Sequence, residues 1–320
     1  MLSAQFIREN VERIRADIAF RGVEAPIDEI LALDKDRRSL LSEVESLRAE
    51  QNAASKAIGA TEDAAERAVR IETARDLSSH VDMLEERLRT VEATLLERLY
   101  EAPNVVAPST PKGTGENANV VVETVGIQPT FAFSPRPHWE IGDTLGGIDI
   151  PRGAKMSGRR FFILRGGIAQ LHRALTQWML NSHIEAGFVE HYLPYMMTKE
   201  SFLASGHLPK FRDDLYRDDE EDYLFIPTAE APFANLYRDE ILPPEAIPQR
   251  LVAHTPCFRR EKMSAGRDSR GLKRVYQFEK VEMFVYCEPE TSDDELQMLL
   301  RRATVIPEQL EIAYRVLELC

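Results

Sequence analysis

Charged and aromatic side chains alternate along a stretch that runs from His254 to Tyr286. Both ends of the stretch are rich in β-branched and aromatic residues, and its middle is rich in Gly, Ser and Asp, so it predicts two strands joined by a long basic loop. Because side chains in a strand alternate between faces, Arg274, Phe278 and Glu282 are expected on one face. At about 3.3 Å per residue, Phe278 and Glu282 would lie roughly 13 Å apart.

These residue types indicate which ligand the face could hold. An arginine fork suits a phosphate, an aromatic ring stacks on a base, and a carboxylate holds an ammonium, so together they would contact an extended nucleotide joined to a small acid. On the first strand, Cys257, Arg259 and Glu261 share a face in the same way. The alternation is equally typical of a half-buried hairpin with a solvated charged rim, and the pattern alone leaves both interpretations open.

A second polar segment lies between Leu224 and Pro232. Thr228 and Glu230 would share a strand face, where a hydroxyl and a carboxylate can bind an ammonium and a small polar side chain. The same spacing is typical of a helix N-cap or capping pair, and by sequence alone this second interpretation is favoured.

Composition limits the class of protein. The 320 residues, of which 43% are hydrophobic, predict two domains with sizeable cores. A net charge of −13 argues against indiscriminate binding to nucleic acid, so an RNA partner would need a local basic track. The three cysteines are widely spaced without a CxxC pair, and we expect neither a disulfide framework nor a protein-bound metal. With charges from Arg8 onward and no bilayer-length apolar run, the chain is predicted to be cytoplasmic, without a membrane partner.

The N-terminal residues are helical in pattern. One helix is expected from Leu2 to Arg21, with Gly22 as its stop. A helical hairpin of about residues 27–101 should follow, because apolar residues recur at alternating steps of three and four on both sides of a short turn. Its two seams are Ile30, Leu33, Leu40, Val44, Leu47, Ala54 and Ile58, interrupted by Arg37 and Gln51, and then Ala74, Leu77, Val81, Leu84, Leu88, Val91 and Leu95.

The function of this hairpin stays open from the pattern alone. It could be a dimerisation rod, a scaffold or a nucleic-acid-binding arm, and mixed charges on its faces are also the usual way in which coiled coils stay soluble. The basic residues on or near exposed faces are Arg37, Arg38, Arg48, Lys56, Arg67, Arg70 and Arg75.

The rest of the chain divides into a linker and a second domain. Pro and Gly residues crowd into the predicted linker, residues 105–134, ahead of and around a strand at Val120–Val122. In the domain of residues 135–320, the pattern predicts a buried strand at Phe161–Leu164, and His138 is expected to be structural. The other predicted elements are a helix at Ile168–Ala186 with Leu171, Leu175, Trp178, Met179 and Ile184 on its apolar side, a helix after Pro289 and a final strand.

Several of these segments carry a family resemblance. Phe258–Glu261, a loop with residues 264–268 and Arg270–Gly271, and the run Arg274–Glu282 together resemble motif 2 of class II aminoacyl-tRNA synthetases, and in detail the motif of seryl-tRNA synthetases. The resemblance implies an α+β fold. An N-terminal antiparallel helical coiled-coil hairpin (residues 1–104 as a tRNA-binding arm) would precede a class II synthetase-type antiparallel sheet domain flanked by helices.

The resemblance also implies residue roles, matched position by position to the family motif. Arg259 and Glu261 would be catalytic, with Arg259 on the α-phosphate of ATP. The expected ATP-binding residues are Arg259, Arg260, Glu261, Arg274, Val275 and Phe278. The expected serine-binding residues are Thr228, Ala229, Glu230, Arg259 and Glu282.

The implied activity is that of a serine–tRNA ligase, which joins serine to ATP as seryl-adenylate and transfers it to tRNA(Ser), with tRNA(Sec) as a further candidate. ATP would be a substrate accompanied by Mg²⁺. The helical arm would bind the tRNA. The helix, strand and Pro194 that resemble motif 1 would form a homodimer interface, for which isologous pairing is expected.

One expected motif was not found in the sequence. Class II enzymes carry a third, glycine-rich motif with an arginine for the γ-phosphate, and no glycine follows Gly271. We therefore expect a C-terminally incomplete fragment with impaired activity. The alternatives are a catalytically inactive dimeric tRNA-binding paralogue and an aminoacyl ligase for another carrier, although a carrier-protein ligase would not need the long arm.

Overall fold

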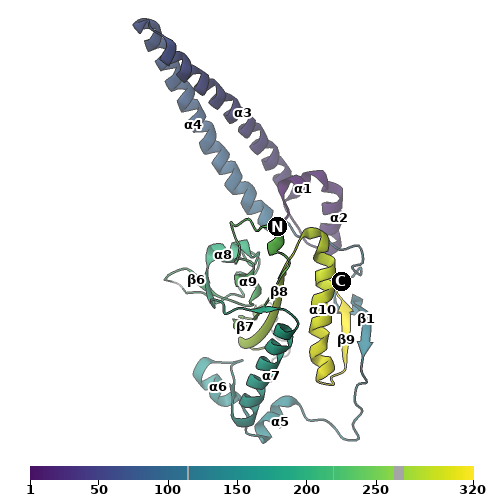
Figure 1. Cartoon of the computed structure of the whole chain (residues 1–320). Coiled ribbons are helices and arrows are strands. Elements are labelled where there is room, and N and C mark those ends of the chain that lie inside the picture. Colours follow the sequence, from purple (N-terminus) through teal and green to yellow (C-terminus); the bar gives the residue numbers. More distant parts are fainter. Residues whose placement is uncertain (114, 219, 263–269) are drawn as a thin grey trace. The chain divides into compact units, whose positions relative to one another are not determined.

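The computed structural model describes residues 1–113, 115–218, 220–262 and 270–320 (Figure 1). The motif residues 264–268 therefore lie outside the described part of the chain. Two compact units are present, one formed by Met1–Val120 with Glu318–Cys320 and the other by Val121–Leu317. None of the helices in the described ranges is long and apolar enough to span a membrane.

The first unit begins with two short helices, α1 (Ala4–Glu9) and α2 (Val11–Arg21), so the expected single helix is wrong at Asn10. Asn10 adopts φ −128° and ψ 33°, outside the helical region. Its side-chain amide donates to the Phe6 carbonyl at 2.9 Å and so competes for the acceptor that its own backbone N–H uses in the helix. Gly22 adopts φ +61° and ends α2, as predicted, because glycine has no Cβ to clash in the left-handed region.

The hairpin consists of α3 (Ile27–Ala60) and α4 (Ala64–Glu101), which confirms the predicted range (Figure 1). Asp63 caps α4 by accepting a hydrogen bond of 2.8 Å from the Glu66 N–H. All residues of the two predicted seams are buried or half-buried. Leu40, Val44 and Leu84 form one of the buried clusters between the helices.

Polar residues along the hairpin pair between helices. Arg37 interrupts the seam because its guanidinium donates to Glu92 on the other helix at 2.9 Å. Arg48 reaches Glu85 in the same way at 2.7 Å. These partly exposed pairs contribute little to stability, and their effect is to specify which faces meet.

The second unit contains a three-stranded sheet in the order β4 (Val189–Glu190), β7 (Gln249–Phe258) and β8 (Gln277–Tyr286). Strands β7 and β8 pair antiparallel along their whole length, which confirms the predicted strand–loop–strand. Strand β4 pairs parallel with β7, so this sheet is mixed and not purely antiparallel.

The two faces of the β7–β8 hairpin have different coverings. Helices α7 (Gly166–Glu185) and α10 (Ser292–Gln309) cover one face, where Leu180, Phe188 and Val252 are buried with Val281, Met283, Val285, Met298 and Leu299 around them. On the opposite face, Leu251 and Ala253 pack against Ala229 and Phe233. The polar side chains of Lys280 and Glu282 lie on that same face.

The remaining strands form three small pairs, β1 (Val120–Val125) with β9 (Tyr314–Glu318), β2 (Ile148–Asp149) with β3 (Ile163–Leu164), and β5 (Met196–Thr198) with β6 (Tyr223–Phe225). The predicted strands at Val120 and at the end of the chain are confirmed. Short helices connect these strands: α5 (His138–Thr144), α6 (Ile150–Ser157), α8 (Lys199–Ala204) and α9 (Glu230–Phe233), with 3₁₀ turns at Glu116–Ala118, Pro244–Ala246 and Pro289–Thr291.

Two sequence predictions in this unit need correction. The strand expected at Phe161–Leu164 covers only Ile163–Leu164 and is half-buried. It is short because its partner strand β2 ends at Asp149, the N-cap residue of α6. The helix expected at Ile168–Ala186 is confirmed as α7, but its predicted apolar side is not its buried side. Leu171 and Leu175 are exposed, whereas Leu180 is buried against the sheet.

We predict that Leu84→Ala destabilises the arm by about 2–5 kcal/mol, because a buried leucine loses its contacts with Leu40 and Val44 and leaves a cavity. Urea unfolding followed by helical circular dichroism measures the change. Met83→Ala is the matched control, since Met83 is 61% exposed, and its effect should stay within about 0.5 kcal/mol. Equal effects of the two substitutions would contradict the interhelical seam.

Candidate functional site

The register of the β7–β8 hairpin places three side chains of β8 on one face. Phe278, Lys280 and Glu282 are paired with Cys257, Thr255 and Ala253, which lie beside them on β7 and are fully buried. Since cross-strand partners share a face, this arrangement confirms that Phe278 and Glu282 lie on the same side. The helix-covered face carries the alternate residues of both strands.

The prediction was wrong for the strand positions of Glu261 and Arg274. Strand β7 ends at Phe258 and β8 begins at Gln277, so both residues lie in the connecting segment. Glu261 turns the chain with φ +50°, a conformation that continued pairing would not allow. The carboxylate of Glu261 accepts a hydrogen bond from the Arg274 guanidinium at 3.3 Å, so the two residues still lie together.

Arg259 lies one residue beyond β7 and is held from two sides. Its backbone N–H donates to the Tyr276 carbonyl at 2.9 Å, which continues the pairing of the two chain segments. Its side-chain Nε donates to the Pro227 carbonyl at 3.2 Å, and its guanidinium lies 5.0 Å from the centre of the Phe278 ring. A cation that could bind a phosphate therefore adjoins a ring that could stack on a base.

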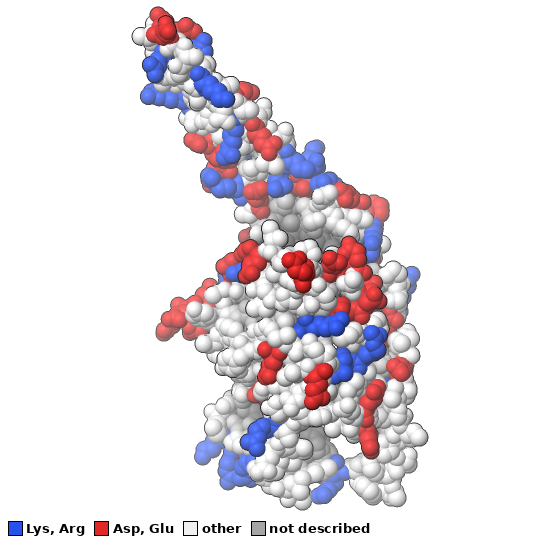
Figure 2. Space-filling model, in the orientation of Figure 1, with Lys and Arg blue, Asp and Glu red and all other residues white. Residues whose placement is uncertain are grey.

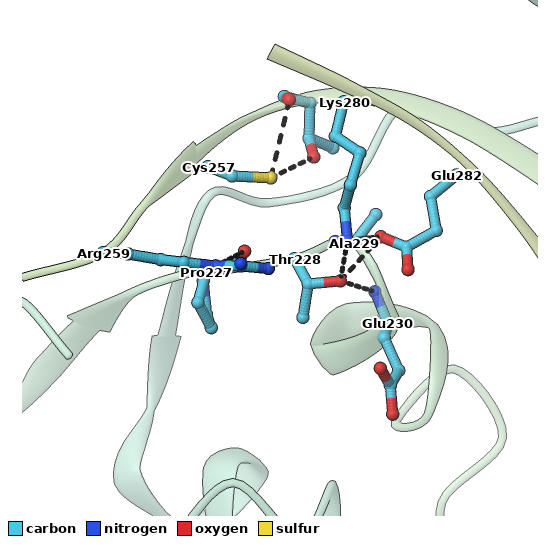
Figure 3. A network of polar contacts seen from close by, with 9 residues as sticks. Pro227, Thr228, Ala229, Glu230, Cys257, Arg259, Lys280 and Glu282 are labelled. Carbon is cyan, nitrogen blue, oxygen red and sulfur yellow. Dashed lines mark hydrogen bonds and ion pairs between the residues drawn. The ribbon is translucent and has the colours of Figure 1, made fainter. Parts of the chain in front are cut away.

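The carboxylate of Glu282 is the centre of a polar network (Figure 3). Its Oε2 atom accepts hydrogen bonds from the Thr228 hydroxyl at 2.6 Å and the Ala229 N–H at 2.9 Å, and the ammonium of Lys280 lies 2.8 Å away. Thr228 also accepts a hydrogen bond of 2.6 Å from Lys280. These three donors hold the Glu282 carboxylate in one orientation on a half-buried face.

Thr228 and Glu230 do not share a strand face, because α9 begins at Glu230. The favoured alternative, a helix start, is closer to the structure. The hydroxyl of Thr228 accepts a hydrogen bond from the Glu230 N–H at 3.3 Å, while Ala229 occupies the N-cap position without a side-chain bond. Thr228 thus points to Glu282, and Glu230 is exposed at the first residue of the helix.

The other predicted site residues line two nearby cavities. The guanidinium of Arg260 lies 5.8 Å from the centre of the Tyr216 ring. The first cavity, of about 400 Å³, is lined by Arg159, Arg160, Tyr216, Arg260, Glu261, Lys262 and Tyr276. Val275 is buried in the wall of a second cavity of about 420 Å³, together with Trp139, Phe161 and Phe162.

Three residues support the site, and sequence reasoning assigned no role to two of them, Lys280 and Asp214. Lys280 has the same strand parity as Phe278 and Glu282, a signal that could have identified it. Asp214 accepts the Lys262 N–H at 2.8 Å through its side chain and the Arg260 N–H at 2.9 Å through its backbone, and no local pattern reveals such a contact. His138 accepts the Leu272 N–H at 2.8 Å, in agreement with its expected structural role.

Comparison with protein families defines the class. The model of the tRNA synthetase class II core domain for glycine, histidine, proline, serine and threonine matches residues 210–320, and the seryl-tRNA synthetase N-terminal domain matches residues 1–106. The β7–β8 hairpin and its polar face therefore lie within the part of the chain that matches a class II aminoacyl-tRNA synthetase core.

Individual relatives specify the family. The serine–tRNA ligase of Thermomicrobium roseum is 47% identical over all of this chain and 72% of its own length, and that of Dehalococcoides mccartyi is 49% identical over all of this chain and 76% of its own. The seryl-tRNA synthetase of Pyrococcus horikoshii, solved in complex with ATP, superposes with a TM-score of 0.90 at 34% identity, covering 99% of this chain and 76% of that one. The chain belongs to the seryl-tRNA synthetase family.

Cys257 lies on β7 opposite Phe278 and is fully buried. We predict that it is chemically protected. Burial raises the pKa of its thiol, and only a thiolate attacks thiol reagents. Cys287 and Cys320 are half-buried. At pH 8, an aromatic disulfide reagent should therefore react quickly with two thiols of the folded protein and with the third only after unfolding.

The Cys257→Ala variant identifies the slow thiol, because it should lose the slow phase and keep the two fast ones. Three fast thiols in the unmodified protein would contradict the burial of Cys257.

Proposed function

We propose that the chain uses the polar face of the β7–β8 hairpin to bind serine and ATP for the formation of seryl-adenylate, which is then transferred to tRNA(Ser). The observation that carries this proposal is the order of groups on one face: the Arg259 guanidinium and Phe278 ring at one end, and the Glu282 carboxylate with Thr228 at the other. A nucleotide and a small amino acid would meet between these ends.

The serine end would be formed by Glu282, Thr228, Ala229 and Glu230. Glu282 is the main partner of the substrate ammonium in this proposal, because its carboxylate is already oriented by the Thr228 hydroxyl and the Ala229 N–H. The exposed carboxylate of Glu230, at the start of α9, would supply a second negative charge. A preorganised site avoids the cost of ordering its groups during binding.

The ATP end would be formed by Arg259, Arg274, Glu261 and Phe278, with Arg260 and Val275 in the cavity walls. Arg259 would stabilise charge on the α-phosphate while the serine carboxylate attacks it and pyrophosphate leaves, and Phe278 would stack on adenine. The contact between Arg274 and Glu261 holds both residues at the entrance to the motif loop. Catalysis would consist of positioning and charge stabilisation, with little need for a protein base.

The magnesium ions expected with ATP would be held mainly by phosphate oxygens. In the described ranges, no group of three or more His, Cys, Asp or Glu side chains could form a metal site. This fits a Mg²⁺ ion bound through one or two carboxylates and the substrate phosphates, because Mg²⁺ rarely uses an all-protein cage. Such an ion would neutralise charge on the nucleotide.

The helical arm would bind the tRNA. Basic and acidic side chains are interleaved along it (Figure 2), and several of its arginines already pair with neighbouring carboxylates, as Arg70 does with Glu66. Lys56, Arg67 and Arg75 are exposed and have no ion pair among the residues that the structure describes. These three cations near the turn between α3 and α4 are available for phosphates.

A homodimer would form through the region that resembles motif 1, from α7 to Pro194. The large apolar side chains exposed there support this proposal, because an interface would cover them: Leu171, Leu175, Ile184, Val189 and Tyr192.

We predict that two substitutions on the polar face each weaken the binding of a different ligand. Glu282→Gln should weaken serine binding by about 30-fold or more, since it removes the charge that pairs with the ammonium. Phe278→Ala should weaken ATP binding by about tenfold or more through lost stacking. Calorimetric titration of the chain with each ligand measures both affinities.

Each variant is the control for the other, because Glu282→Gln should retain ATP binding and Phe278→Ala should retain serine binding. An unmodified chain that binds neither ligand would refute the proposed function.

We also predict that the combined substitutions Lys56→Ala, Arg67→Ala and Arg75→Ala weaken binding of tRNA(Ser). The slope of log affinity plotted against log salt concentration should become less negative by about 2–3, because three phosphate contacts are lost. Arg70→Ala is the control and should have a smaller effect, since Glu66 already neutralises Arg70. Filter binding at several salt concentrations gives both values, and equal effects would exclude the three cations as the tRNA contacts.

A further inference from the structure

The ammonium of Lys280 lies inside the network to which we assign substrate recognition. Its Nζ atom is 2.6 Å from the Thr228 hydroxyl oxygen and 2.8 Å from Oε2 of Glu282, and the side chain points from β8 to these atoms (Figure 3). A primary ammonium is therefore bound between a hydroxyl and a carboxylate. These are the groups that the α-ammonium of serine would use.

Two ammonium groups cannot both use this arrangement. Oε2 of Glu282 already has three donors around it, namely the Thr228 hydroxyl, the Ala229 N–H and the Lys280 ammonium. A second cation at the same oxygen would meet the Lys280 charge at close range, where like charges repel strongly in a partly buried site. An arriving ammonium therefore requires Lys280 to leave.

Lys280 is not needed to orient Glu282. The Thr228 hydroxyl and the Ala229 N–H hold the carboxylate from the opposite chain segment, and both donors would stay if the lysine moved. The side chain of Lys280 is 30% exposed and has a flexible four-carbon stem, so it has a way out to solvent. Thr228, in contrast, is buried and cannot follow it.

We propose that Lys280 is an internal place-holder for the substrate ammonium: it fills the amino-group subsite of the empty protein, and serine binds by displacing it. This inference rests on the proposed function. The lysine would keep Glu282 neutralised when no amino acid is bound. Every ligand that places an ammonium in this subsite would be weakened by the same factor, the fraction of sites that Lys280 leaves open.

The test compares serine binding to the unmodified chain and to Lys280→Met by calorimetry at equal ATP concentration. If Lys280 fills the subsite about nine-tenths of the time, its removal should tighten serine binding by about tenfold, because the apparent dissociation constant is divided by the fraction of open sites. Ethanolamine, which has the ammonium and hydroxyl of serine but no carboxylate, should gain to a similar extent. Unchanged or weaker serine binding by a folded Lys280→Met protein would overturn the inference.

Two further variants complete the experiment. Lys199→Met removes the same charge from an exposed position in α8 and should leave serine affinity unchanged. Lys280→Gln repeats the neutral substitution with a polar side chain and should also tighten binding, and it replaces Lys280→Met if that variant does not fold. Failure of the unmodified chain to bind serine would refute the proposed function, whereas serine binding without a gain in the neutral variants would refute only the place-holder.

Discussion

The candidate site depends on the hydrogen bonds that hold the carboxylate of Glu282. A carboxylate on a half-buried strand face needs donors, and here they come from a different part of the chain, from Thr228 and Ala229. These two bonds join the end of the segment before α9 to the middle of β8. The position of the Glu282 carboxylate and the local fold are therefore linked, because the same two hydrogen bonds fix both.

The two faces of the β7–β8 hairpin have different roles. One face buries apolar residues under α7 and α10, which holds the hairpin in place. Because the strand period is two, every second residue is left for the opposite face, where Phe278, Lys280 and Glu282 project in order. The register of the ten residue pairs therefore places these three side chains in a row along one face of the sheet.

Positive charge is concentrated locally although the chain is acidic overall. The net charge is −13, yet four Arg and Lys side chains, from residues 159, 160, 260 and 262, line one cavity of about 400 Å³ beside the motif. Concentrated local charge gives attraction to phosphates without general affinity for nucleic acid. On the arm the same principle holds, because most arginines there are neutralised by carboxylates and only particular cations are left available.

The sequence by itself determined the helical hairpin and its seams, the two long strands and the face shared by Phe278 and Glu282, because periods of 3.5 and 2 are local properties of the chain. The resemblance to the family, through its motif 2, could also be recognised from the sequence. Tertiary structure decided the buried side of α7 and the contacts of Lys280 and Asp214, because their partners are distant in sequence and meet only when the chain has folded. The split at Asn10 and the helix start at Glu230 involve local side-chain hydrogen bonds, which hydrophobic periodicity does not predict.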